Sequence, residues 1–160
     1  MKTTRYQKIF ITGALGFVGR ALAEQYRRLG AEACGLDVRA DSALTIVAGD
    51  VSKSEVWQSA MDGCDLVIHT AAIVTNNVAR EEAWRVNVLG ARRVLDAAIR
   101  ARAKRFLHIS SLAAMRFNVE DRADESAPVM PTGNPYVDTK IASEHVVLAE
   151  VPMADPLELA

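Results

Sequence analysis

The sequence lacks a surplus of charge of either sign. Its 160 residues include 19 basic and 20 acidic side chains, which gives a formal net charge of −1 at pH 7. Nucleic acids and anionic membranes attract proteins mainly through an excess of basic side chains, and this chain has none. We therefore expect it to bind neither nucleic acid nor a membrane surface.

Long hydrophobic runs and paired cysteines are also missing. The longest apolar stretch, residues 66–74, contains His69 and is far shorter than the roughly 20 residues that cross a bilayer. The polar residues 1–8 lack the apolar core of a signal peptide. Cys34 and Cys64 do not have the Cys-x-x-Cys spacing of metal or redox sites. A cytoplasmic protein with no bound metal and no disulfide fits these features best.

What is present is the composition of one globular domain, with 50% hydrophobic and 24% charged residues. Short apolar runs alternate with longer segments of helical spacing. The predicted strands cover residues 8–12, 33–36, 44–48, 65–73 and 105–109. The predicted helices cover residues 17–29, 52–62, 80–102 and 135–150. Repeated strand–helix units imply right-handed crossovers, so we predict an α/β fold with a doubly wound parallel sheet, the Rossmann fold.

A glycine-rich turn, TGALGFVG at residues 12–19, joins the first predicted strand to the first predicted helix. Gly13 permits the tight turn, Gly16 lets a pyrophosphate approach the backbone, and Gly19 lets the helix pack closely on the strand. The Gly-Lys-Ser/Thr ending of nucleoside-triphosphatase loops is missing, which excludes that class. We predict a dinucleotide site here. Its contacts would come from Gly13, Leu15, Gly16, Phe17, Val18 and Gly19.

Asp37 closes the second predicted strand, where a dinucleotide fold places an acid on the adenosine ribose. Its carboxylate can accept hydrogen bonds from the ribose hydroxyls and would repel a 2′-phosphate. NAD is therefore the expected cofactor, with NADP disfavoured. Two readings compete with this one: Asp37 as a solvated loop acid, and Arg39 as a guanidinium that accommodates the 2′-phosphate.

Tyr136 and Lys140 lie one turn apart on one face of the last predicted helix. A fixed ammonium beside a phenol favours the phenolate form, which suits general acid–base catalysis. The pair is common by chance, so its value comes from chain order. It follows the glycine turn, the strand-end Ser110-Ser111 doublet and the loop 116–134, which is long enough to be the rim of an active site.

With these motifs in this order, the chain resembles the extended branch of the short-chain dehydrogenase/reductase family, also called the NAD-dependent epimerase/dehydratase family. The resemblance runs from about residue 8 to residue 150. It rests on TGALGFVG (12–19), GDV (49–51), HTAA (69–72), VNVLG (86–90), SS (110–111) and YVDTK (136–140).

The resemblance implies a catalytic role for four residues. Tyr136 would be the general acid/base, and Lys140 would favour the ionised phenol and hold the nicotinamide ribose. Ser111, in preference to Ser110, would hydrogen-bond the reacting oxygen. Asn87 matches the helix asparagine that supports a proton relay in many members, although a plain polar helix residue would look the same.

Further cofactor contacts follow from the resemblance. Asp50 and Val51 would meet the adenine, and the small residues Ala71 and Ala72 would let the strand end pass close to the cofactor. The implied contacts outside the glycine turn are Asp37, Asp50, Val51, Thr70, Ala71, Ala72, Tyr136 and Lys140.

The expected organisation is a dinucleotide-binding domain over residues 1–150 and a tail, 151–160, that does not match the family's next segment. The smaller substrate-binding lobe of the family is absent from the sequence, as in a chain truncated before it. A small-molecule substrate and a homodimer formed through the Asn87 and Tyr136 helices are also implied. On those helices, apolar residues that one sheet face would not fully cover include Val94, Leu95, Val146 and Val147.

The favoured function is an NAD(P)-dependent oxidoreductase or epimerase/dehydratase that transfers hydride at a secondary alcohol or carbonyl. The apolar residues after His69 favour a similarity to hydroxysteroid-dehydrogenase-like members of the family. A non-catalytic NAD(P)-binding module or an inactive truncated fragment is the alternative. An S-adenosylmethionine-dependent methyltransferase shares the glycine turn and the acid but does not require the later Tyr136 and Lys140.

Overall fold

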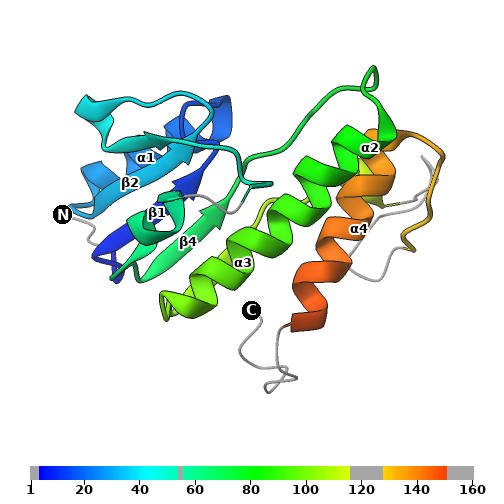
Figure 1. Ribbon diagram of the computed structural model, residues 1–160. Helices are drawn as coiled ribbons and strands as arrows, with labels where there is room; N and C mark the ends of the chain where they lie inside the picture. The colour runs from blue at the N-terminus through cyan, green and yellow to red at the C-terminus, as the bar shows by residue number, and fades with distance from the viewer. Residues whose placement is uncertain (1–3, 54–55, 116–127, 151–160) are drawn as a thin grey trace.

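Five parallel strands form one sheet in the order β3-β2-β1-β4-β5 in the computed structural model (Figure 1), which describes residues 4–53, 56–115 and 128–150. The strands are β1 (Lys8–Thr12), β2 (Glu32–Asp37), β3 (Ile46–Ala48), β4 (Leu66–His69) and β5 (Arg105–His108). The predicted doubly wound sheet is confirmed. Chain order reverses at β1, which pairs with both β2 and β4. The carboxyl ends of β1 and β4 therefore form the switch point where such sheets bind ligands.

Helices connect the strands and cover the sheet. The α-helices are α1 (Phe17–Arg28), α2 (Arg80–Ala83), α3 (Gly90–Arg100) and α4 (Pro135–Glu150). Short 3₁₀ turns are η1 (Ser42–Leu44), η2 (Val56–Met61) and η4 (Leu112–Ala114). The π-helical segment η3 (Trp84–Leu89) joins α2 to α3.

The core has two layers because neighbouring residues of a strand point to opposite faces of the sheet. Ile9 of β1 is buried in the same cluster as Ala23 of α1. The next residue, Phe10, is buried in another cluster with Trp57 of η2 and Val94 of α3. Both faces of the central strand are thus covered, which explains its uninterrupted apolar sequence.

The fourth strand is shorter than predicted. β4 ends at His69, whereas its apolar sequence continues to residue 73. The Thr70 hydroxyl donates to the Thr12 carbonyl at 2.7 Å, and the Ala71 amide donates to the Thr12 hydroxyl at 3.3 Å. These bonds turn the chain across the end of β1 and out of the sheet.

Two other predicted boundaries also moved. The third strand begins at Ile46, because the Asp41 carboxylate accepts from the Leu44 amide and holds the preceding residues in η1. The single helix predicted over 80–102 is divided by η3 and ends at Arg100. The helix predicted over 52–62 includes residues 54–55, which lie outside the described residues, and its later part is the 3₁₀ turn η2. Residues 116–127 of the predicted rim loop and the tail 151–160 also lie outside the described residues.

α3 and α4 lie side by side (Figure 1) and share a cluster of Leu95, Val147 and the partly buried Phe106. The expectation that apolar residues of these helices lack cover is wrong for Val94, Leu95 and Val147, which are buried within the chain, while Val146 is half-buried. The helices close over the sheet and over each other. The large apolar residues that stay exposed are instead Ile99 of α3, Leu148 of α4 and Leu89 at the end of η3.

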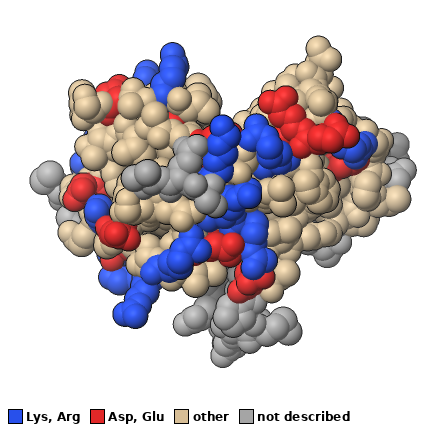
Figure 2. All heavy atoms as spheres, viewed as in Figure 1, with Lys and Arg blue, Asp and Glu red and all other residues tan. Residues whose placement is uncertain are grey.

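Basic side chains, interspersed with acidic ones, gather over α3 in Figure 2. Arg92 pairs with Asp96 at 3.0 Å and with Glu150 of α4 at 2.7 Å. These pairs fit the solvated face of a helix. In the described part of the chain, no helix has the length and apolar character needed to cross a membrane.

Candidate functional site

The glycine turn after β1 is shaped by close backbone contacts. Gly13 has a φ of +66°, and a Cβ there would stand 2.9 Å from the Ala71 amide nitrogen. A Cβ on Gly19 would stand 2.2 Å from the Gly13 carbonyl oxygen. Any side chain at either position would collide with backbone, so the turn needs glycine for a conformational reason at the first position and a steric reason at the second.

Asp37 is tied to this turn by the end of β2. Its carboxylate accepts hydrogen bonds from the Leu15 amide at 2.9 Å and from the Val38 amide at 2.8 Å. Leu15 thus contributes through its backbone by fixing the acid, and its side chain is not part of the cavity wall. The predicted ribose acid therefore stands beside the glycine turn, although 22 residues separate it from Leu15 in the sequence.

A cavity of about 660 Å³ opens at the switch point. The sequence-predicted residues that line it are Gly13, Gly16, Phe17, Val18, Gly19, Asp37, Asp50, Val51, Thr70, Ala71 and Ala72. Wall residues that sequence reasoning missed are Leu36, Val38, Gly49, Ile73, Val74, Glu82, Arg85 and Val86. Of the missed residues, Gly49 and Val86 belong to the GDV and VNVLG motifs but were not singled out, whereas Ile73, Glu82 and Arg85 lie outside the motifs.

One end of the cavity carries an ion pair between Asp50 and Arg85, whose atoms are 2.8 Å apart. The Asp50 carboxylate also accepts from the Ser52 amide at 2.8 Å and hydroxyl at 2.7 Å. Burial alone would raise the pKa of Asp50, but the hydrogen bonds from Ser52 and Arg85 lower it to about 2. Asp50 is therefore a fixed negative charge at neutral pH.

The serine doublet after β5 divides its contacts. The Tyr136 hydroxyl donates to the Ser111 hydroxyl at 3.3 Å. The Ser110 hydroxyl instead donates to the Glu144 carboxylate, further along α4. The geometry thus brings Ser111, and not Ser110, to the predicted acid–base tyrosine.

Lys140 lies one turn after Tyr136 and is only 4% exposed. Its ammonium donates to the carbonyl of Ile109 at 2.6 Å. Burial lowers the pKa of Lys140 to about 8, and the nearby Glu144 carboxylate opposes that shift. The lysine is therefore charged in neutral solution but close to losing its proton.

Asn87 connects the cavity wall to α4. Its side-chain oxygen accepts from the Ile73 amide at 2.8 Å, and its amide group donates to the Thr139 hydroxyl at 3.0 Å. Ile73 lines the cavity and Thr139 precedes Lys140. Asn87 lies in η3, where the widened helix turn belongs to the same segment as Arg85. The structure thus places it as a brace between the two parts of the site.

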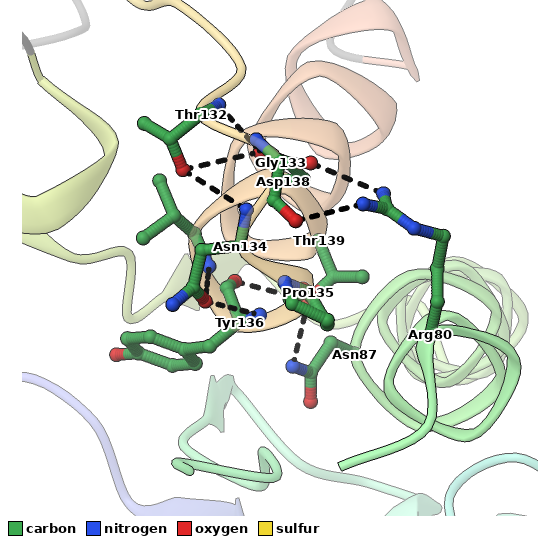
Figure 3. A network of polar contacts seen from close by, with 10 residues as sticks. Arg80, Asn87, Thr132, Gly133, Asn134, Pro135, Tyr136, Asp138 and Thr139 are labelled. Carbon is green, nitrogen blue, oxygen red and sulfur yellow. Dashed lines mark hydrogen bonds and ion pairs between the residues drawn. The ribbon is translucent and has the colours of Figure 1, made fainter. Parts of the chain in front are cut away.

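A polar network fixes the start of α4 (Figure 3). The Asn134 side chain accepts from the Tyr136 amide at 2.9 Å and so caps the helix. Asp138 accepts from the Thr132 amide at 2.7 Å and pairs with Arg80 of α2 at 3.1 Å. The pair of Arg80 and Asp138 joins residues 58 positions apart, so the sequence did not reveal it. The Asn134 cap is local, and an Asn directly before a Pro at a helix start is the signal that could have found it.

Two histidines, the buried His69 and the half-buried His108, stand side by side at the ends of β4 and β5. The rings of His69 and His108 stack with centroids 5.4 Å apart. His69 shares a hydrogen bond with Thr12 at 2.7 Å, and His108 with Ser143 at 3.1 Å. Burial lowers the pKa of His69 well below its usual value, and lowers that of His108 to about 4. Both rings are neutral core groups; among the described residues, no cluster of three metal-ligating side chains occurs.

A second cavity, of about 540 Å³, lies beside Ser111. Its wall follows directly after the serine and includes part of the segment before α4. The lining residues are Leu112, Ala113, Ala114, Met115, Met130, Pro131 and Thr132. Among the described residues, no charged side chain lines it, so an anionic ligand group would find no partner among them.

A doubly wound parallel sheet with a glycine turn at its switch point defines a Rossmann-type nucleotide-binding domain. Comparison with known proteins gives the family. The model of the NAD dependent epimerase/dehydratase family matches residues 9–152, so the chain belongs to that family, as the motif order predicted.

Named relatives show what the chain is similar to. It is 30% identical over 162 residues to the "3 beta-hydroxysteroid dehydrogenase/Delta 5-->4-isomerase" of Mycobacterium tuberculosis, with 92% of this chain and 44% of the relative covered. It is 32% identical to the "Sterol demethylase protein B" of Methylococcus capsulatus, with 88% of this chain and 46% of the relative covered. The chain therefore spans less than half the length of these curated relatives.

Among solved structures, a short-chain dehydrogenase/reductase superfamily protein from Agrobacterium tumefaciens, crystallised with bound NAD, superimposes with a TM-score of 0.78. The two sequences are 31% identical, and the match covers 88% of this chain and 44% of that one. The similarity extends through most of the chain described above.

Proposed function

We propose that the chain binds NAD in the 660 Å³ cavity and serves an oxidoreductase that uses Ser111, Tyr136 and Lys140 at a secondary alcohol or carbonyl. The observation that carries the proposal is the hydrogen bond between Tyr136 and Ser111 with the buried ammonium of Lys140 one turn away. These groups stand where β5 ends, in the same sheet whose switch point holds the glycine turn.

The cavity fits the cofactor in two respects. Gly16 lines the cavity at the start of α1, where a pyrophosphate can approach backbone amide groups, and Gly13 and Gly19 permit the close backbone contacts that shape this turn. Asp37, held by two backbone amides, presents a carboxylate that suits ribose hydroxyls and disfavours a 2′-phosphate. Asp50 and Val51 supply the wall assigned to the adenine.

Bound NAD would supply the hydride acceptor or donor. The chain's own residues handle the proton: the Tyr136 hydroxyl gives it to, or takes it from, the reacting oxygen. Ser111 hydrogen-bonds that oxygen, and the Lys140 ammonium stabilises negative charge on the phenol. Asn87 holds α4 against the cavity wall, which keeps this group of side chains in register with the cofactor.

The substrate that fits best is apolar near its reacting carbon, as in a hydroxysteroid. The support comes from the cavity beside Ser111, which has no charged side chain among its described lining residues and is walled by Leu112, Met115 and Met130. Sterol-related names among the relatives agree with this choice.

The test combines binding with turnover. Calorimetry should give tighter binding of NAD than of NADP by at least about tenfold, because Asp37 repels the 2′-phosphate. Replacement of Asp37 with Ser should reduce that preference, whereas replacement of the exposed Arg39 with Ser should leave it unchanged.

The turnover test follows NADH formation with 3β-hydroxysteroids, short secondary alcohols and sugar nucleotides. Tight NAD binding with no reduction by any alcohol would instead favour the non-catalytic module, and equal affinity for both cofactors would contradict the role of Asp37.

A further inference from the structure

The end of β5 contacts α4 through four successive residues. Each of the four residues makes a hydrogen bond to a side chain of α4. Neighbouring partners on α4 are four residues apart or fewer, which is about one helical turn or less. The pairs are Ser111 with Tyr136, Ile109 with Lys140, His108 with Ser143 and Ser110 with Glu144. Two of these pairs belong to the proposed reaction site. The pair of Ser110 and Glu144 has no role in the proposed reaction.

Lys140 presents an electrostatic problem that this fourth pair can solve. A buried ammonium is costly unless an opposite charge lies close to it. Lys140 is nearly fully buried and its ammonium donates to a neutral carbonyl, that of Ile109. In the described ranges Lys140 makes no ion pair, so its positive charge needs a counter-charge at somewhat longer range.

Several other charged groups on neighbouring elements are engaged in ion pairs, and the two neighbouring histidines are neutral. Arg80 pairs with Asp138, Arg85 with Asp50, and Arg92 with Asp96 and Glu150. Burial keeps His69 and His108 uncharged at neutral pH. The remaining charged side chains on α2 and α3, the helices that pack against α4, are Glu81, Glu82, Arg93 and Arg100.

We infer that Glu144 is a positioning residue that supplies the counter-charge for the buried Lys140 ammonium, and that the Ser110 hydroxyl orients its carboxylate. This inference rests on the proposed function. Glu144 lies four residues after Lys140, and side chains at this spacing share one face of a helix. Ser110 directly follows the Ile109 carbonyl that binds Lys140. The strand end thus holds the ammonium with one residue and the carboxylate with the next.

The electrostatics of the site agree with this geometry. Burial lowers the pKa of Lys140, and Glu144 is the charge that opposes the fall. Without the carboxylate, Lys140 would lose its proton at a lower pH. In the proposed reaction it would then stop stabilising the Tyr136 phenolate, and activity would decline earlier on the alkaline side.

The experiment measures the titration of Lys140 directly, by NMR of the chain labelled with ¹³C at its five lysines. The Lys140 signal is assigned by its loss in Lys140→Arg. Glu144→Gln should lower the titration midpoint of Lys140 by about one pH unit, since one nearby charge has been removed. Ser110→Ala should lower it less, and Glu144→Asp should retain part of the effect. Glu150→Gln, on the same helix but paired with Arg92, is the matched control and should change nothing.

An unchanged midpoint in Glu144→Gln, or an equal shift in Glu150→Gln, would overturn the inference. If Glu144→Gln fails to fold, Ser110→Ala decides, and an unshifted midpoint there also overturns it. The titration needs neither NAD nor substrate, so a shifted midpoint without any hydride transfer would refute the proposed function alone. Where transfer is observed, the alkaline limb of its pH profile should move with the midpoint.

Discussion

The two parts of the site, the glycine turn with Asp37 and the end at Tyr136, differ in whether backbone or side-chain groups form them. The glycine turn and Asp37 depend on backbone: amide groups, glycines without a Cβ, and a carboxylate fixed by two main-chain hydrogen bonds. The end at Tyr136 depends on side chains that meet at the edge of the sheet, each held by a partner distant in the sequence. The cofactor part is therefore constrained by the central strands themselves, whereas the other part is only as well placed as the packing of α4.

A first prediction separates chemistry from binding at the two parts. Tyr136→Phe removes the phenol that exchanges a proton in the proposed reaction, and Tyr136 is not among the residues that line the NAD cavity. We expect hydride transfer to fall by roughly 10²–10⁴-fold with NAD affinity nearly unchanged. Stopped-flow detection of NADH together with calorimetry checks both values. Tyr26→Phe, at a partly buried tyrosine in α1, is the control, and transfer within a few-fold of wild type in Tyr136→Phe would refute the assigned role.

The second prediction tests the backbone character of the glycine turn. Gly19→Ala places a Cβ 2.2 Å from the Gly13 carbonyl oxygen, and neither group is free to move. Unfolding free energy should fall by roughly 3 kcal/mol, and NAD affinity should fall with it. Gly16→Ala meets the same oxygen at 3.1 Å and should lose only about 1 kcal/mol. Denaturant titration of both variants gives the comparison; equal losses would show that the contact at Gly19 is not the constraint.

The third prediction concerns acid sensitivity, which should arise mainly at the side-chain part. Burial lowers the pKa of His108 to about 4. The unfolded chain therefore binds the proton more readily, so the contribution of His108 is complete above pH 6.5 and is lost as pH falls toward 4. Between pH 7.5 and 5 the loss is about 2 kcal/mol. Asp50 of the cofactor part, with a pKa of about 2, stays charged over this range.

The measurement is the unfolding free energy at both pH values. His108→Gln should show a fall between pH 7.5 and 5 that is smaller than wild type by about 2 kcal/mol. His145→Gln alters an exposed histidine on α4 and should keep the wild-type fall. A His108→Gln variant as acid-sensitive as wild type would place the effect elsewhere in the molecule.

Sequence reasoning reached the cofactor part more completely than the other. Every predicted residue of the glycine turn except Leu15 lines the cavity, together with Asp37, Asp50 and the segment after β4. The reason is local: glycines at fixed spacing after an apolar run determine the turn, and parallel strands bring their carboxyl ends to one edge. Even so, Arg85 and Glu82 of the wall could not be found, because no pattern marks which face of a helix borders a cavity.

By itself, the sequence determined the alternation of strands and helices, the glycine turn, the doubly wound parallel sheet and the family. These follow from period, composition and backbone sterics over short stretches of chain. Only the tertiary structure decided that Ser111 meets Tyr136 while Ser110 meets Glu144, that Asn87 braces Ile73 against Thr139, and that β4 stops at His69. Adjacent serines have the same chemistry, and a strand and a loop can contain the same apolar residues. The two serines, and the strand and the loop, are distinguished by their hydrogen-bond partners. The fold brings these partners close although they lie 25 to 58 residues away in the sequence.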